Sequence, residues 1–359
     1  MNENAMGYLI YPDHNVLDQM AKGDPFGVRW LFNNPKFTVV FSDENLNEVR
    51  SSKGFENTFL QLLKDVKAKH IKPIMDGNFQ QTGKAEVRDI DPFKAYASYI
   101  ENVELMPEFG YGLSGMLQKF YGGRSNISFQ EISDKGADEL KTLLLSSIKE
   151  LENIEELDQE TRCNIKQAAE QLPQVIKAIS ESLAIKLDSQ NDKSQVRQFE
   201  DAVGVGPIIL NNIKGPNVLL NVWKKVKEGF PKMEEQKIDM DLETFFGLKK
   251  SPWNNLSDRV PTLQEKVNAI YHQLNFLGYY RDSKMKVERR FNASFSDMTH
   301  AGVASFCHLF ICQDEDLVMK ATAAYEYLGI NTKIIFLRFG RGYEMLGAVR
   351  RPPVPSMQK

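Results

Sequence analysis

The chain has 359 residues, of which 42% are hydrophobic and 26% charged, a composition typical of a soluble globular protein. Its net charge of −3 is unlike that of a basic protein that coats nucleic acid, but it does not exclude an enzyme that grips a few phosphates. No apolar run is long enough to span a bilayer, the N-terminus lacks a signal pattern, and three dispersed cysteines exclude a disulfide framework. We therefore expect a cytoplasmic protein with no membrane association.

Residues 1–75 alternate between short apolar stretches and amphipathic ones. The stretch that begins at Tyr8 predicts a strand that ends in Asp13, and a helix follows from about Asn15. A second apolar stretch predicts a strand with Ser42 at its end and Glu48 inside the next helix. Strands that alternate with helices predict an α/β domain with a parallel sheet covered by helices on both faces.

From residue 76 the pattern changes. The polar, glycine-containing stretch 76–92 predicts a loop or a domain boundary. Long amphipathic helices are predicted at 136–157 and 159–186, and another helix at 262–280 ends near Gly278. Because a structureless connection of this length is implausible in a compact protein, we interpret 76–284 as a mostly α-helical insertion.

The last part of the chain returns to the α/β pattern. Asp297 is predicted to open a helix, a short strand covers 308–312, and Asp314 stands at the end of that strand. A helix to Gly329 and a final strand at 332–337 complete the sheet. We therefore divide the chain into 1–75 (first half of the α/β domain), 76–284 (insertion), 285–345 (second half) and 346–359 (a basic, disordered tail).

Four carboxylates occupy comparable places in these two halves. Asp13 and Asp314 follow strands, while Glu48 and Asp297 lie in or at the start of helices that face the same edge of the sheet. Ligands of open α/β sheets bind outside the carboxyl ends of the strands. Four carboxylates gathered there would repel one another without a cation, and their hard oxygen atoms suit Mg²⁺ or Mn²⁺.

Four motifs, in this order along the chain, resemble those of the PIN-like nuclease family. They are Asp13-x-Asn15, Ser42 with Glu48 six residues later, Asp297-x-x-His300-Ala301-x-x-Ala304, and Cys312-Gln313-Asp314-Glu315-Asp316. Cys312 stands where the family usually has threonine. The resemblance covers roughly the first 70 and last 70 residues. It implies a PIN-like sheet domain and a metal-dependent nuclease, most commonly an endoribonuclease, with Asp13, Glu48, Asp297 and Asp314 as its catalytic metal ligands.

Further residues near these motifs are candidates for supporting roles. Asp316 and Glu44 are possible additional metal ligands, while Asn15, His300 and Lys320 are candidates for substrate contact. Each also has a simpler explanation, as a solvated helix residue, a turn residue or a hydrogen-bonded helix histidine. Asp13, Asp297 and Asp314 could likewise be helix N-caps, because capping is a common role for aspartate at such places.

Three functions remain open at this level. The first is a ribonuclease that binds RNA. The second is a structure-specific DNA nuclease in which the insertion forms an arch or clamp. The third is an inactive scaffold, for example in bacterial defence or a toxin system, that binds a protein partner or a second copy through the insertion. Metal dependence separates the enzymes from the scaffold, and sensitivity to the 2′-hydroxyl separates RNA from DNA cleavage.

Overall fold

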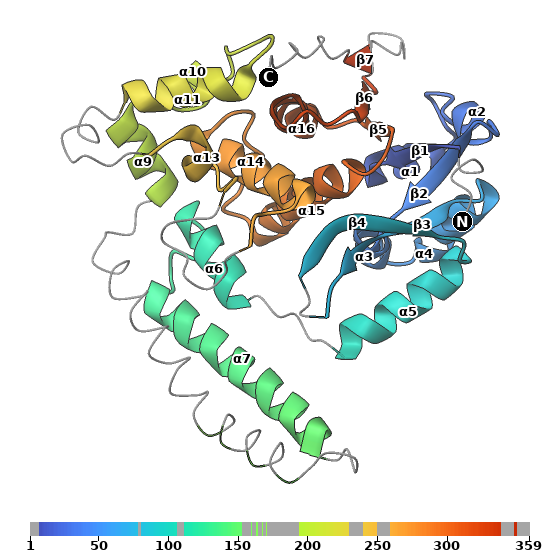
Figure 1. Ribbon diagram of the computed structural model, residues 1–359, viewed down its shortest axis with the longest axis horizontal. Coiled ribbons are helices and arrows are strands. Elements are labelled where there is room, and N and C mark those ends of the chain that lie inside the picture. Colours follow the sequence, from blue (N-terminus) through green and yellow to red (C-terminus); the bar gives the residue numbers. More distant parts are fainter. Residues whose placement is uncertain are drawn as a thin grey trace. The chain divides into compact units, whose positions relative to one another are not determined.

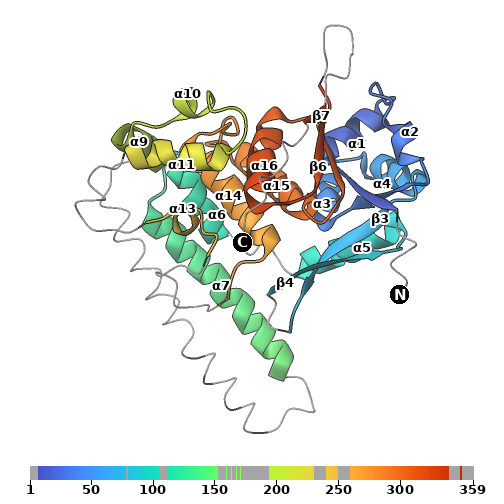
Figure 2. The ribbon, with the colours of Figure 1, turned by 45° about the horizontal axis from the view of Figure 1, so that its top comes forward.

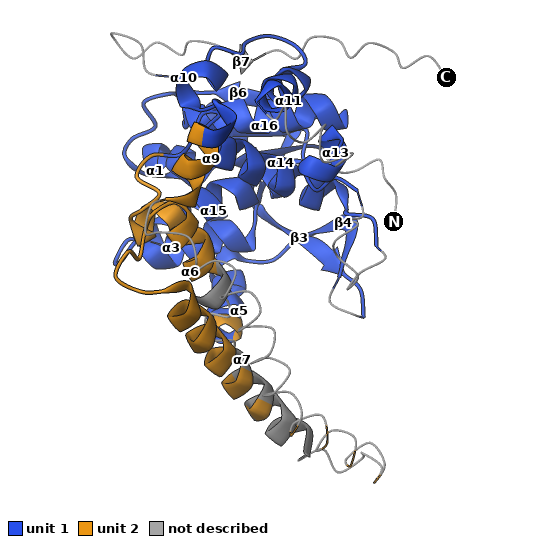
Figure 3. Cartoon of the chain, turned by 90° about the vertical axis from the view of Figure 1, so that its left-hand side faces the viewer, with its two compact units in different colours: residues 1–101, 202–282, 293–359 blue, residues 102–201, 283–292 orange. Residues whose placement is uncertain are grey.

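The computed structural model describes residues 7–77, 80–105, 111–152, 194–229, 240–249, 259–338 and 348–349, with four single positions between 159 and 170. The chain divides into two compact units, which Figure 3 shows in different colours. The first comprises residues 1–101, 202–282 and 293–359, and the second residues 102–201 and 283–292. Every strand in the described part of the chain and every candidate site residue belongs to the first unit.

The first unit is built on a seven-stranded sheet in the order β4-β3-β2-β1-β5-β6-β7. The strands are β1 (Tyr8–Pro12), β2 (Phe37–Phe41), β3 (Lys69–Met75), β4 (Gln81–Arg88), β5 (Leu309–Cys312), β6 (Lys333–Phe336) and β7 (Ala348–Val349). β1, β2, β3, β5 and β6 are parallel, and β4 and β7 pair antiparallel at the two edges. The predicted α/β class with a mainly parallel sheet is therefore confirmed.

The two halves of the sheet meet at β1 and β5, which Figure 1 shows side by side in blue and red-brown. Ile10 pairs with Leu309 and Pro12 with Ile311, so the sheet joins residues about three hundred positions apart. Such a pairing has no local sequence signal, and it depends on both strands being buried and apolar.

Helices cover the sheet on both faces, as Figure 2 shows for α15 and α16 on one side and α1 on the other. In the first unit they are α1 (His14–Ala21), α2 (Arg29–Phe32), α3 (Asp43–Ser51), α4 (Glu56–Asp65), α5 (Pro92–Leu105), α10 (Pro207–Leu210), α11 (Val218–Glu228), α13 (Leu242–Phe245), α14 (Leu263–Leu277), α15 (Glu288–Ala304) and α16 (Glu315–Leu328). The second unit holds α6 (Tyr111–Phe120), α7 (Phe129–Glu152) and most of α9 (Gln195–Val203). α5 and α15 extend across the unit boundaries.

Successive side chains along each strand point to opposite faces of the sheet, and the side chains on each face determine which helices pack there. Ile10 and Ile311 belong to a buried apolar cluster with side chains of α1, α3 and α4. Tyr11 and Phe310, one position away, point to the opposite face, where Tyr11 contacts His300 of α15. The sheet is thus buried on both sides, as expected for parallel strands.

Three sequence predictions about elements were wrong. The stretch 76–92 is not a loop, because it contains the edge strand β4, whose half-buried residues and Gly83 weaken the usual alternation. The helix of Asp297 begins nine residues earlier, at Glu288, because the polar residues between them are accommodated within the helix. β6 is followed by β7, so it is not the last strand.

The unit boundaries also differ from the predicted insertion at 76–284. Residues 202–282 belong to the α/β unit, in part because α14 packs against α16. The predicted helix at 159–186 and most of the tail at 346–359 lie outside the described residues. Within the described ranges, no helix combines the length and apolar character needed to cross a bilayer.

Two glycines that end helices differ in their surroundings and allow a matched test. Gly278 ends α14 at φ +96°, and an added Cβ would lie 2.7 Å from Pro207 Cδ. Gly329 ends α16 at φ +68°, with nothing within 4 Å of an added Cβ. We expect Gly329→Ala to cost about 1–2 kcal/mol through the left-handed backbone alone, and Gly278→Ala to cost clearly more. Urea unfolding would measure both, and equal losses would contradict the role of the Pro207 contact.

Candidate metal centre at the carboxyl edge of the sheet

The strand order reverses direction at β1, since β2 lies on one side of it and β5 on the other. Crevices at the carboxyl ends of strands at such a reversal are the usual binding sites of open α/β sheets. Asp13 follows β1 directly, and its backbone N–H donates to the carbonyl of Ile311 in β5 over 2.9 Å. Asp314 follows β5 after one intervening residue. The two sequence halves therefore deliver a carboxylate each to the same edge of the sheet.

Asp13 is 1% exposed and caps α1. Its carboxylate accepts hydrogen bonds from the backbone N–H of Asn15 (3.4 Å) and from the Asn15 side-chain amide (3.2 Å). The pKa of Asp13 is raised to about 6, mainly by burial; His300 opposes this increase, and the nearby Glu48 carboxylate adds to it. Asn15 thus orients Asp13. The Asn15 side chain is exposed, so it is accessible to a substrate, and the predicted substrate contact stays a prediction.

Asp297 lies on α15 and is partly buried among other acids. Burial raises its pKa well above the usual range, and the carboxylates of Asp13, Asp282 and Asp314 raise it further. Within the described part of the chain, the Asp297 carboxylate makes no hydrogen bond or ion pair. Asp314 caps α16 by accepting a hydrogen bond from the backbone N–H of Leu317 (2.9 Å). The structure therefore brings together Asp13, Asp297 and Asp314, each from a different element.

Glu48 stands on α3 and is held by α15. Its Oε2 lies 2.8 Å from His300 Nε2, and its Oε1 accepts a hydrogen bond from the Ser296 hydroxyl (3.0 Å). The same hydroxyl lies 2.8 Å from Glu44 Oε1, so it can serve either carboxylate. Burial raises the pKa of Glu48, but the positive charge of His300 and its hydrogen bond outweigh this effect and lower that pKa.

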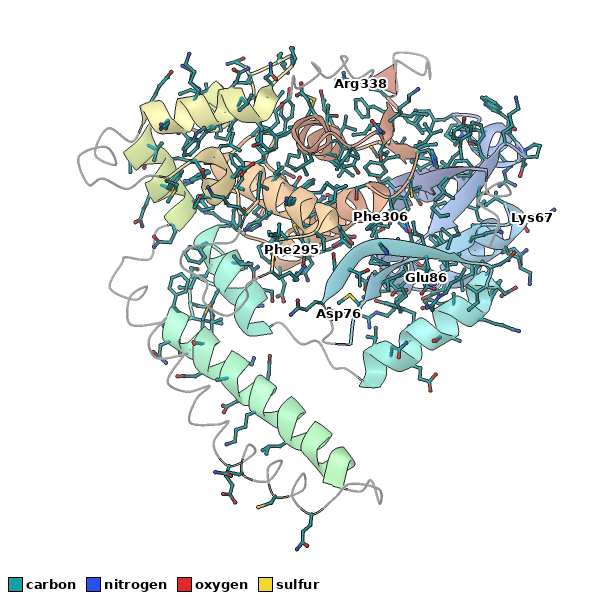
Figure 4. The ribbon with its side chains drawn as sticks, in the orientation of Figure 1. Lys67, Asp76, Glu86, Phe295, Phe306 and Arg338 are labelled. Atoms are coloured by element: carbon teal, nitrogen blue, oxygen red, sulfur yellow. The ribbon has the colours of Figure 1, made fainter. Side chains whose placement is uncertain are left out.

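His300 is completely buried, which corrects its predicted role as a substrate contact. Its Nδ1 lies 2.6 Å from the Tyr11 hydroxyl, which in turn lies 2.7 Å from the Ser42 hydroxyl. Burial lowers the pKa of His300, but Glu48, with smaller contributions from Asp13 and Glu44, raises it to about 10. His300 therefore orients Glu48 and adds positive charge beside Asp13. In Figure 4 the labelled Phe295 and Phe306 bracket the segment that carries Asp297 and His300.

Lys320 is also completely buried, so it is not available to a substrate phosphate as predicted. Its ammonium donates to Asp282 Oδ1 (2.6 Å) and to the carbonyl of Tyr280 (2.7 Å), and it lies 4.7 Å from the ring centre of Tyr271. Asp316, one helical turn earlier on α16, is half-buried. Burial raises its pKa to about 6; Lys320 opposes this, whereas Asp314 and Asp282 add to it.

Several residues around this centre had no signal in the sequence. Tyr11 lies in an apolar strand and resembles an ordinary core residue, and His14 stands at the first position of a helix. Asp282 follows the end of α14 in a polar stretch, where a carboxylate is unremarkable. Its two oxygens are engaged by Lys320 and by the Ser294 hydroxyl (2.5 Å). Only the tertiary packing brings these side chains beside the predicted ones.

The donor set fits a divalent cation. Carboxylate oxygens are the ligands that Mg²⁺ and Mn²⁺ prefer. Among the described residues the Asp297 carboxylate makes no hydrogen bond or ion pair, and the charge of His300 only partly offsets the increase in its pKa. Comparison of this chain with models of protein families, with curated proteins and with solved structures finds no match. The resemblance to PIN-like nucleases therefore stays an expectation from the motifs, and the function has to be argued from the site.

Proposed function

We propose that this chain is a metal-dependent nuclease that hydrolyses phosphodiester bonds, and that it acts as an endoribonuclease. The observation that carries the proposal is the proximity of Asp13, Asp297 and Asp314 at the carboxyl ends of β1 and β5, where Asp13 and Asp314 raise the pKa of Asp297. The raised pKa values of Asp13 and Asp297 reflect burial and mutual repulsion, which a bound cation would relieve. The choice of RNA rests on the resemblance to the PIN-like family.

Each residue then has a definite role. Asp13, Asp297 and Asp314 would hold Mg²⁺ or Mn²⁺, with Glu48 and Asp316 beside them. When bound, such a cation lowers the pKa of water and stabilises the leaving oxygen of a phosphodiester. The chain's own residues orient these ligands, because Asn15 holds Asp13, and His300 with Ser296 holds Glu48. Nucleic acid is the partner that this chemistry implies.

The test compares labelled single-stranded RNA and matched DNA in Mg²⁺, in Mn²⁺ and in chelator. We expect metal-dependent cutting of RNA by the wild type and its loss in Asp13→Asn. Asp65→Asn is the matched control, because Asp65 is an exposed carboxylate at the end of α4. Preferential cutting of DNA would favour the structure-specific DNA nuclease instead. If wild type and Asp13→Asn behave alike, the nuclease proposal fails and the scaffold alternative is preferred.

A further inference from the structure

Two histidines lie beside the carboxylates of Asp13 and Glu48. Glu48 Oε2 is 2.8 Å from His300 Nε2 and 3.8 Å from His14 Nδ1. One donor atom each from Asp13, Glu48 and His300 can be chosen so that all three lie within 4.8 Å of one another. The three residues come from the end of β1, from α3 and from α15, so the group exists only in the folded unit.

The shortest of these separations is close to that of two atoms in a shared coordination sphere. Two donor atoms that bind one ion at about 2.1 Å and at right angles lie roughly 3 Å apart. The separation of His300 Nε2 and Glu48 Oε2 is within a few tenths of that value. Small side-chain movements would therefore suffice for both atoms to bind one ion, which would replace the proton between them.

The surroundings of His300 resemble those of a metal-binding histidine. A ligating histidine usually makes a hydrogen bond through its other ring nitrogen, which fixes the orientation of the ring. His300 Nδ1 makes such a bond to Tyr11, whose hydroxyl is held by Ser42. His14 packs against Phe59 with 4.6 Å between ring centres. In the described part of the chain, its buried Nδ1 has no hydrogen-bond partner.

We propose that Asp13, His14, Glu48 and His300 bind a transition-metal ion in preference to Mg²⁺. Imidazole nitrogen suits ions such as Zn²⁺, Cu²⁺, Fe²⁺ and Ni²⁺, whereas carboxylate, carbonyl and water oxygens suit Mg²⁺ and Mn²⁺. The buried Nδ1 of His14 makes no hydrogen bond in the described part of the chain, and its 3.8 Å separation from Glu48 Oε2 places it beside this group. Asp13 and Glu48 also belong to the proposed nuclease centre, so any role of this site in catalysis rests on the proposed function. Its metal binding does not.

The test uses the full chain, freed of metal and titrated with Zn²⁺ or Mg²⁺ alone. We expect a lower Kd for Zn²⁺ than for Mg²⁺, by at least about tenfold. Pulsed electron paramagnetic resonance of the complex with one equivalent of Cu²⁺ should show coupling to imidazole ¹⁴N. His300→Gln and His14→Gln should each weaken Zn²⁺ binding by about 10–100-fold and reduce the nitrogen signal.

His308→Gln is the matched control, because His308 is exposed at the opposite end of β5 and accepts a hydrogen bond from the backbone of Leu9. It should leave both Kd and spectrum unchanged. Should His300→Gln not fold, the wild-type spectrum and His14→Gln decide the question. A wild-type spectrum without ¹⁴N coupling would overturn the proposal. Because no nucleic acid is present, this result is separate from failure of the nuclease assay.

Discussion

Asp297→Asn is expected to abolish metal-dependent cleavage while making the metal-free protein more stable. The variant keeps the shape of the side chain but removes a charge that has no hydrogen-bond or ion-pair partner in the described structure. Loss of one ligand to a cation that contributes several kcal/mol of transition-state stabilisation corresponds to roughly a thousandfold in rate. A substitution that lowers activity but raises stability is typical of a functional site whose charged groups destabilise the protein when no ligand is bound.

The pH dependence of this effect has a definite sign. The carboxylates of Asp13 and Asp297 have pKa values that are raised by folding, to about 6 for Asp13. As pH rises, the carboxyl groups of Asp13 and Asp297 therefore lose their protons at a lower pH in the unfolded chain, from about pH 4, than in the folded protein. The contribution of these two carboxylates to the free energy of unfolding of the metal-free protein should therefore fall as pH rises from about 4 to 6, and further as Asp297 ionises, whereas Glu48, whose pKa is lowered, contributes with the opposite sign. Asp297→Asn should make this fall shallower.

Urea unfolding in chelator between pH 4 and 8 measures the stability part, and the RNA cleavage assay measures the activity part. Asp65→Asn again serves as the control and should change neither quantity appreciably. Added Mn²⁺ should stabilise the wild type more than Asp297→Asn. An Asp297→Asn protein that is both less stable and fully active would contradict the assignment of this carboxylate to a cation site.

Lys320→Met is expected to cause the largest loss of stability, about 3–5 kcal/mol, because it leaves Asp282 as a largely buried, unpaired charge. The Asp282 carboxylate already lies close enough to Asp297 and Asp316 to raise their pKa values. The methionine side chain is similar in volume to that of lysine, so the loss of packing is small and the loss of charge dominates.

Arg338→Ala provides the comparison for an exposed ion pair. Arg338 lies 3.4 Å from Glu315 with both side chains about half exposed, and its loss should cost no more than about 1 kcal/mol. Combining Lys320→Met with Asp282→Asn should restore part of the stability, because no buried charge is then left alone. If the double variant is no better than Lys320→Met, packing rather than charge accounts for the loss. Urea unfolding at pH 7 measures all three variants.

The local parts of the fold were predictable because they depend on neighbouring residues. Asp13 and Asp314 cap helices directly after buried strands, and Gly278 and Gly329 end helices where a left-handed residue was expected. The edge strand β4 was missed because a strand covered on few sides needs no alternating pattern. The true start of α15 was missed because Asp297 lies inside the helix despite the preference of aspartate for N-caps, and tertiary packing can override such a local preference.

By itself, the sequence determined the α/β class, the strands and helices of the two halves, and three aspartates at one edge of the sheet. Each of these follows from short-range periodicity and capping chemistry. Only the tertiary structure decided that Glu48 is paired with His300, that Lys320 is buried against Asp282, and that His14 lies beside Glu48. These pairings join elements separated by tens to hundreds of residues. Which side chains meet there depends on how the helices pack on the sheet, and no local pattern records that packing.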